Sequence, residues 1–313
     1  MKENAKSIKQ RLLNLSKAKQ IDYNNVLLVR YFHERFLYRL SLSAYRSSFY
    51  LKGGALLYAL AEEFPRPTID IDLLGVSVKS DHEDLINIFA EICQMECPED
   101  GIVFDIQSIK ASEIVTTKKY PGVRISFIGY LDTIRKTLQV DVGFGDTSTM
   151  QELTYPTLLN NLPGAKLCAY ATEYVVAEKF HAMIFLAEIN SRFKDFYDVY
   201  TILLQQSVDD EALQRAIGQT FQTRKTEYMA NHPLFSADFT NDKNRLLRWS
   251  HFLKKIKVEH LDFEEVVKTI TTNLQPIYQQ LNGNVLNSLT FIIFAEKNDE
   301  TLSHNSLSIL QSG

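Results

Sequence analysis

The fold is decided by two short stretches, Leu51-Lys52-Gly53-Gly54 and Arg66-Pro67-Thr68-Ile69-Asp70-Ile71-Asp72. The glycine pair opens a predicted helix from Ala55 to Glu63, and a loop then leads into a predicted strand. Alternate residues of a strand point to the same face, so we expect Asp70 and Asp72 to project together. The intervening apolar positions are expected in the core, and these are Ile69, Ile71 and Leu73.

Two carboxylates on one face of a strand predict a cation site. They repel each other and shift each other's pKa unless a cation lies between them. Mg²⁺, or Mn²⁺ in its place, fits because hard divalent cations prefer oxygen ligands. The alternative is that Asp70 and Asp72 form only the solvated face of an edge strand.

The glycine pair predicts a phosphate site. Gly53 and Gly54 lie at the start of the predicted helix, where free backbone N–H groups and the positive end of the helix dipole can hold phosphate. A phosphate site beside a cation site indicates phosphoryl or nucleotidyl transfer, with an NTP as the substrate.

A third acid lies further along the chain. Asp141 stands in the apolar stretch Leu138-Gln139-Val140-Asp141-Val142, where an unpaired carboxylate would be costly. If this predicted strand neighbours that of Asp70 and Asp72, the three carboxylates converge and can hold one or two Mg²⁺ ions.

The composition is that of an ordinary globular protein. The chain has 313 residues, of which 45% are hydrophobic and 23% charged, and its net charge of −4 argues against a generally basic nucleic-acid binder. Three scattered cysteines are too few for a disulfide scaffold and suit a reducing compartment. The N-terminus has no signal-peptide pattern and no apolar run is long enough to span a membrane, so we expect a cytoplasmic protein.

The periodicity predicts two domains of an α/β (α+β) fold. Helices over residues 5–47 and 81–95, the latter capped by Asp81, surround a small mixed sheet in a domain of residues 1–160. The predicted sheet includes strands over residues 102–109, 123–131 and 138–144. Residues 161–313 are mostly α-helical, with predicted helices over 172–189 and 195–204, while residues 284–297 fit a strand or a short helix.

These motifs resemble the nucleotidyltransferase superfamily of the DNA polymerase β type. Lys52-Gly53-Gly54, Arg66-x-Thr68-x-Asp70-x-Asp72 and Val140-Asp141-Val142 are more closely similar to the AbiEii/AbiGii toxin family of abortive-infection and type IV toxin–antitoxin systems. The second half adds Glu178-Lys179 and Arg192-Phe193-Lys194-Asp195-Phe196-Tyr197-Asp198, which look like that family's E-K and R-x-K-D-x-x-D signatures. The resemblance covers roughly residues 50–205 and implies a nucleotidyltransferase-like mixed sheet, with a helical domain that completes the active site.

The resemblance assigns roles to individual residues. It implies that Asp70, Asp72 and Asp141 bind the metal, one of them also helping to deprotonate the acceptor, and that Gly53 and Gly54 cradle the triphosphate. Three further nucleotide-binding positions are Lys52, Arg66 and Thr68. Arg66, between two prolines, equally suits a rigid turn, and the Thr68 hydroxyl suits a cap, a phosphate contact or a modification site.

The second-half residues have two interpretations. Lys179 lies on a largely apolar helix and either extends to solvent or contacts phosphate and polarises the nucleotide. Asp195 and Asp198 share a helix face at i, i+3 spacing. They either pair with Lys179 and Arg192 to hold the helices in register, or supply an acid/base group, for which Asp195 is preferred, beside a nucleotide-binding Asp198.

The resemblance also implies the function. The expected activity is transfer of a nucleotide from an NTP to an acceptor hydroxyl, with Mg²⁺ and with RNA, the tRNA 3′ end in particular, as the acceptor. A cognate antitoxin is expected as a partner, with or without a stable complex. The alternatives are a small-molecule or protein acceptor, or a non-catalytic nucleotide-binding module.

A basic segment from Lys243 to Lys257 would suit an RNA acceptor. It carries six Lys or Arg residues and no acid, with Trp249 and Phe252 among them. These residues either follow an RNA backbone and stack a base, or form a solvated helix face with an aromatic core stripe.

Overall fold

The chain divides into two compact units, Met1–Val175 and Val176–Gly313. The computed structural model describes residues 2–60, 67–114, 122–144, 149–205 and 208–281. The sequence suggested a boundary near residue 160. The division falls later because residues 150–170 contribute two strands, β6 (Met150–Thr154) and β7 (Lys166–Tyr170), to the sheet of the first unit.

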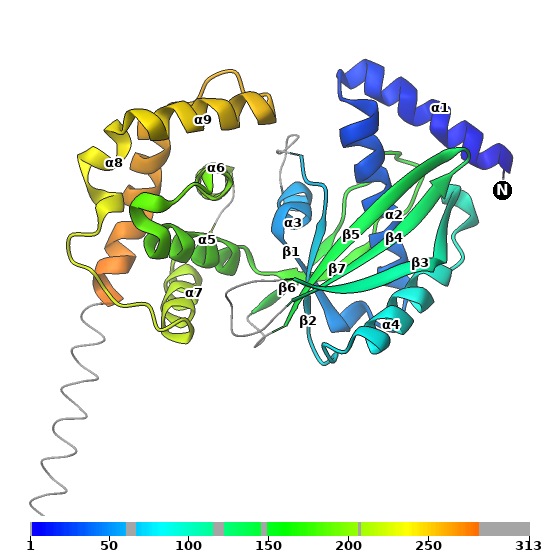
Figure 1. Cartoon of the computed structure of the whole chain (residues 1–313), viewed down its shortest axis with the longest axis horizontal. Helices are drawn as coiled ribbons and strands as arrows, with labels where there is room; N and C mark the ends of the chain where they lie inside the picture. The colour runs from blue at the N-terminus through cyan, green and yellow to red at the C-terminus, as the bar shows by residue number, and fades with distance from the viewer. Residues whose placement is uncertain (1, 61–66, 115–121, 145–148, 206–207, 282–313) are drawn as a thin grey trace, which may run out of the picture. The chain divides into compact units, whose positions relative to one another are not determined.

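The first unit is built on a mixed sheet. The described strands, which Figure 1 labels, are hydrogen-bonded in the order β3-β4-β5-β2-β1-β7-β6. Besides β6 and β7, its strands are β1 (Phe49–Lys52), β2 (Ile71–Gly75), β3 (Ile102–Ile114), β4 (Gly122–Leu131) and β5 (Ile134–Phe144). The pairs β2–β5 and β1–β7 are parallel and the others antiparallel. The three strands predicted after residue 100 are confirmed, and β3 and β5 are longer than expected.

The helices of the first unit also follow the sequence pattern, with one break. They are α1 (Lys2–Lys19), α2 (Leu28–Leu42), α3 (Gly53–Leu60) and α4 (His82–Gln94), with a π-helical turn at Tyr23–Leu27 and 3₁₀ turns at Arg46–Ser48 and Pro98–Asp100. The expected helical stretch over 5–47 is interrupted at Gln20, where φ is +53°. Asp81 caps α4 as predicted, accepting hydrogen bonds from the backbone N–H groups of Glu83 and Asp84.

Aromatic side chains form the core between α2, α4 and the sheet. The Phe36 ring of α2 lies 5.6 Å from that of Phe89 on α4 and 5.1 Å from that of Phe127 on β4. Phe104 on β3 packs edge-on against Phe127 at 5.5 Å. Each ring is buried, and such pairs add to the stabilisation that comes from burial alone.

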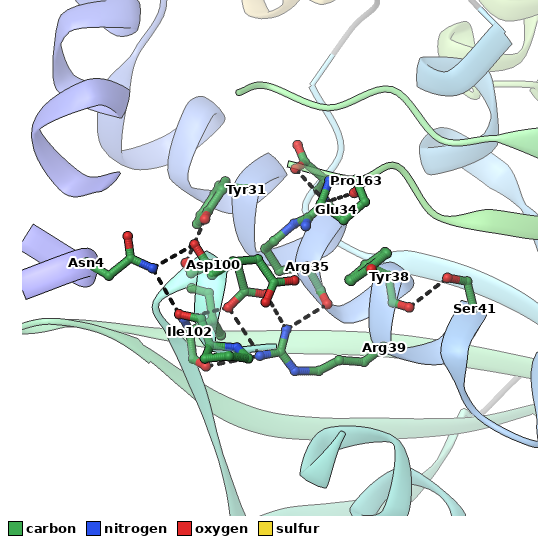
Figure 2. Close-up of polar contacts among 12 residues, drawn as sticks. Asn4, Tyr31, Glu34, Arg35, Tyr38, Arg39, Ser41, Asp100, Ile102 and Pro163 are labelled. Carbon is green, nitrogen blue, oxygen red and sulfur yellow. Dashed lines mark hydrogen bonds and ion pairs between the residues drawn. The ribbon is translucent and has the colours of Figure 1, made fainter. Parts of the chain in front are cut away.

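A buried charge network ties α2 to the start of β3 (Figure 2). Arg39 donates to both carboxylate oxygens of Asp100, at 2.6 and 3.2 Å, and to the carbonyl of Ile102 at 3.1 Å. Asp100 also accepts from the backbone N–H of Ile102, and the Tyr31 hydroxyl donates to the Asp100 carbonyl. Because Arg39 and Asp100 are both buried, removal of either side chain would leave the other as an uncompensated buried charge.

The described part of the second unit is helical. It comprises the rest of α5 (Thr172–Leu186), α6 (Phe193–Gln205), α7 (Asp210–Thr223), α8 (Ala237–Asn241), α9 (Lys243–Ile256) and a helix over residues 263–281, with 3₁₀ turns at Ala187–Ile189 and Pro233–Phe235. Phe263 joins the core of this unit, where its ring meets those of Phe193, Phe196 and Trp249 within 6 Å. The mostly α-helical character expected here is therefore confirmed.

Some of the sequence predictions differ from the structure or lie outside its described residues. The prediction that Ile69 faces the core is wrong: β2 begins at Ile71, so Ile69 precedes the strand and is 69% exposed. Arg66 and residues 284–297 lie outside the described residues. Across the described helices, none is both long and apolar enough to cross a membrane.

Candidate functional site

The junction of β1 and α3 requires glycine. Gly53 has φ of +62°, in the left-handed region, and a Cβ atom there would lie 1.8 Å from Oδ2 of Asp72. A Cβ on Gly54 would lie 2.6 Å from the Thr68 hydroxyl oxygen. The glycine pair therefore lets the start of α3 lie close to Thr68 and to Asp72 on β2.

Four charged residues form a row across four adjacent strands. Lys52 on β1 pairs with Asp72 on β2, Asp72 pairs with Asp141 on β5, and Asp141 pairs with Arg124 on β4. Directly paired residues of neighbouring strands point to the same face of a sheet. The structure thus places Asp141 beside Asp72, as the sequence suggested, and brackets the two acids with one cation on each side.

Arg124 was not predicted from the sequence. Its Nε and Nη2 atoms donate to the two oxygens of Asp141, each at 2.7 Å. The hydrogen bond to Asp141 raises the pKa of Arg124, and the negative charges of Asp70 and Asp72 act in the same direction. The guanidinium therefore lies in the field of all three candidate metal-binding carboxylates.

Asp70 lies immediately before β2 and is held by its neighbours. The Thr68 hydroxyl donates to Oδ1 of Asp70 at 2.9 Å, a hydrogen bond that orients that carboxylate. Behind it, burial lowers the pKa of His33 on α2 to about 4, although the charge of Asp70 and a hydrogen bond with the backbone of Ile69 oppose this shift. His33 is therefore neutral at physiological pH, and sequence reasoning missed it.

Lys52 is oriented by an aromatic ring. Its ammonium lies 4.8 Å from the ring centroid of Tyr170 on the neighbouring β7. A cation–π contact of this kind fixes a flexible lysine without neutralising its charge. The residue stands next to Gly53, where the backbone N–H groups at the start of α3 lie.

The carboxylate oxygens of Asp70, Asp72 and Asp141 are the donor type that a divalent cation prefers. As the side chains stand, no three His, Cys, Asp or Glu side chains of the described residues are arranged to hold a metal ion. Both oxygens of Asp141 accept hydrogen bonds from Arg124. The donor set therefore fits a divalent cation, provided that Asp141 turns from Arg124.

The motif residues of the second unit form a separate ion-pair cluster. Nζ of Lys179 on α5 donates to Asp195 and Asp198 on α6, each at 2.8 Å, and Nε of Arg192 lies 2.7 Å from the second oxygen of Asp195. Asp195 is fully buried, whereas the Lys179 side chain is 13% and the Arg192 side chain 50% exposed. The cluster fixes α6 against α5, which is one of the two interpretations of these residues.

Electrostatics keep this lysine charged. Burial lowers the pKa of Lys179, but the negative charges of Asp198 and Asp195 and their hydrogen bonds outweigh it, so the pKa is raised overall. The preceding residue, Glu178, lies 3.5 Å from Arg224 at the end of α7, and Arg224 in turn contacts His181. The E-K motif therefore joins α5 to two other helices.

The basic segment is divided between surface and core. Arg245 is buried and donates to the carbonyls of Phe239 and Glu188, and Trp249, at 3% exposure, donates to the carbonyl of Leu261. The hypothesis that Trp249 stacks a base is therefore wrong, because its ring fills the core. The exposed cations of α9 and its C-cap are Lys243, Arg248, Lys254, Lys255 and Lys257.

A mixed sheet with paired aspartates on neighbouring strands, next to a glycine-opened helix, is the arrangement that the sequence motifs led us to expect of a nucleotidyltransferase. The family model described as nucleotidyl transferase AbiEii toxin, type IV TA system, matches residues 35–269. The chain belongs to this AbiEii family and is accordingly a nucleotidyltransferase toxin of a type IV toxin–antitoxin system.

Two solved structures from Helicobacter pylori are similar to the chain. The protein JHP933 is 14% identical, with 83% of this chain and 95% of that chain covered and a TM-score of 0.44. A protein described as a candidate nucleotidyltransferase is 13% identical, with 83% and 97% covered and the same TM-score. A comparison with curated proteins found no match.

Proposed function

We propose that the chain transfers a nucleotide from an NTP to an acceptor hydroxyl, with Mg²⁺ or Mn²⁺ bound by Asp70, Asp72 and Asp141. The observation that carries this proposal is the direct pairing of Asp72 on β2 with Asp141 on β5. Asp72 also pairs with Lys52, the residue that precedes Gly53 at the start of α3. A divalent cation at these carboxylates would neutralise phosphate charge and lower the pKa of the acceptor hydroxyl.

The residues of the chain would divide the remaining work. The backbone N–H groups of Gly53 and Gly54 would bind phosphate at the start of α3, with the Asp72 and Thr68 side chains as their near neighbours. Lys52 would add a positive charge beside them. One of the three carboxylates would accept the proton of the attacking hydroxyl, and Thr68 would keep Asp70 in position through its 2.9 Å hydrogen bond.

We propose RNA, and the tRNA 3′ end in particular, as the acceptor. The supporting feature is the exposed basic face of α9, where Lys243, Arg248, Lys254 and Lys255 lie on one side of the helix while Trp249 and Leu253 face the core. A face with several cations and no acid suits contacts with a phosphate backbone. The family also implies a cognate antitoxin, which we propose as a partner without requiring a stable complex.

Label transfer tests the proposed function. The protein is incubated with Mg²⁺, each α-labelled NTP in turn and total tRNA, beside an Asp70→Ala/Asp72→Ala variant whose melting curve is recorded. Label on tRNA from the unmodified protein alone is the expected result and identifies the nucleotide. Label on an added small hydroxylated compound or on protein would replace the RNA acceptor, and the absence of any transfer by a folded protein would refute the enzymatic proposal.

A further inference from the structure

We propose that Arg124 is a transferable cation: it holds Asp141 while the site is empty and binds the phosphates of the incoming nucleotide once Asp141 turns to coordinate the divalent cation. The inference rests on the proposed function and adds to it a nucleotide-binding residue. The motifs of the sequence do not contain Arg124.

The geometry places Arg124 at the edge of the carboxylate row. It faces Asp141 directly across β4 and β5, and the next residue in the row is Asp72. The two parallel hydrogen bonds, both 2.7 Å long, occupy each oxygen of Asp141. A divalent cation and Arg124 therefore compete for the same carboxylate.

The charges of the row show how a bound divalent cation would displace Arg124. With Lys52 and Arg124 present, the row carries two positive and two negative charges, so Asp72 and Asp141 can lie side by side without a bound metal. Once a divalent cation adds two further positive charges, the guanidinium is repelled, and the triphosphate that arrives with the cation offers it a new partner.

The chemistry of the side chain suits that partner. The planar guanidinium presents paired N–H donors that match phosphate oxygens as well as they match a carboxylate. The Arg124 side chain is 38% exposed, against 17% for Asp141, so the guanidinium borders solvent where it holds the carboxylate. In contrast, the buried Arg39 is enclosed with Asp100.

A fixed salt bridge makes the opposite prediction. If Arg124 serves only to orient Asp141, its removal would weaken metal binding or leave it unchanged, and phosphate binding would not depend on it directly. If it is a transferable cation, its removal strengthens metal binding in the absence of nucleotide and weakens binding of the phosphates. The direction in which metal affinity changes when Arg124 is removed therefore distinguishes a fixed salt bridge from a transferable cation.

The test uses the full chain and two probes that do not require activity. Binding of Mn²⁺ alone is measured by electron paramagnetic resonance, and binding of inorganic triphosphate at saturating Mg²⁺ by calorimetry. The variants are Arg124→Gln, Arg124→Lys and Asp72→Ala, with melting curves for each. The matched control is Arg135→Gln, which removes an exposed arginine at the far end of the same strand pair.

Arg124→Gln is expected to bind Mn²⁺ roughly two- to fivefold more tightly and triphosphate several-fold more weakly, since a partly exposed ion pair is worth a factor of this order. Arg124→Lys should keep more of the triphosphate affinity, and Arg135→Gln should change neither affinity. An Arg124→Gln protein with unchanged or weaker Mn²⁺ binding, or with unchanged triphosphate binding, would overturn the inference.

The same experiment tests the metal site of the proposed function separately, through the Asp72→Ala variant. Mn²⁺ binding that is lost in Asp72→Ala supports the proposed metal site whatever Arg124→Gln does. If neither the unmodified protein nor Arg124→Gln binds Mn²⁺, the metal site and the inference fail together.

Discussion

Gly53 and Asp72 approach so closely that no side chain fits between them: a Cβ atom on Gly53 would lie 1.8 Å from Oδ2 of Asp72. Lys52 and Asp72 are direct partners in β1 and β2, so the strand pairing brings the start of α3 onto the carboxylate. The glycine thus permits both the left-handed backbone, with φ of +62°, and the close approach of the Asp72 carboxylate.

Gly53→Ala should therefore abolish label transfer and lower the melting temperature. The left-handed backbone alone costs a non-glycine residue about 1–2 kcal/mol, and displacement of Asp72 adds to this. The matched control is Gly218→Ala in α7, where the new Cβ meets only Leu281 at 3.9 Å. That change should leave activity intact and, because alanine favours helix, should not lower the stability. Full activity of Gly53→Ala would contradict the role given to the junction.

Much of the fold was predictable from local patterns, because alternating apolar residues mark β4 and β5 and a capping aspartate marks α4. The strands β6 and β7 were not predicted, since loop residues Pro163 and Gly164 dominate that part of the sequence. Asp70 and Asp72 were predictable as candidate ligands because they stand two residues apart among apolar residues, although only Asp72 lies on β2. Arg124 was missed because its partner is 17 residues away and only the register of β4 with β5 brings them together.

Lys179 offers a test that separates structure from chemistry. Lys179→Met removes the cation that the buried carboxylates Asp195 and Asp198 share, which should cost about 3–5 kcal/mol of stability. The further changes Asp195→Asn and Asp198→Asn in the same chain should restore much of the melting temperature. If any of the three residues takes part in the chemistry, label transfer stays absent in this stable triple variant.

Recovery of activity along with stability would reduce Lys179 to a structural role. The matched single change is Lys194→Met in the same motif, since Lys194 is exposed on α6 and makes none of the ion pairs of the cluster. Its melting temperature and its label transfer should both stay close to those of the unmodified protein.

The buried pair Arg39 and Asp100 should be worth far more than a surface pair. Arg39→Met leaves Asp100 enclosed without its cation, and we expect a loss of about 3–5 kcal/mol in denaturant unfolding. Arg46→Met, which breaks the exposed pair with Glu152 at the same 2.6 Å separation, should cost less than about 1 kcal/mol. Equal losses in the two variants would refute the importance assigned to burial.

Glu34 predicts a pH dependence of stability. Burial raises its pKa to about 7 from 4.5, although Arg35 and the backbone N–H of Leu158 oppose the shift. Because the folded state holds this proton more tightly than the unfolded state, the contribution is fully present below pH 4.5 and is lost as the pH rises through 7. The shift corresponds to at most ~3 kcal/mol. Glu34→Gln should flatten the dependence of the melting temperature on pH between pH 5 and 8, and an unchanged slope would show that Glu34 does not change its protonation on unfolding in this range.

The basic face of α9 should bind the acceptor rather than the NTP. Lys254→Glu/Lys255→Glu is expected to raise the KM for tRNA while the KM for the NTP stays constant, because these cations lie on the exposed face. If both lysines contact phosphates, the slope of log affinity against log salt should fall by up to about 1.4, at roughly 0.7 per contact with a single strand.

The control for this change is Lys17→Glu/Lys19→Glu. Those lysines are likewise exposed in the last turn of their helix, α1, so the cost to the helix dipole is matched. A loss of tRNA affinity in the α9 variant alone would assign the acceptor to this face. Equal losses in both variants would mean that general charge rather than the α9 surface attracts the RNA, and no loss in either would remove α9 from the acceptor site.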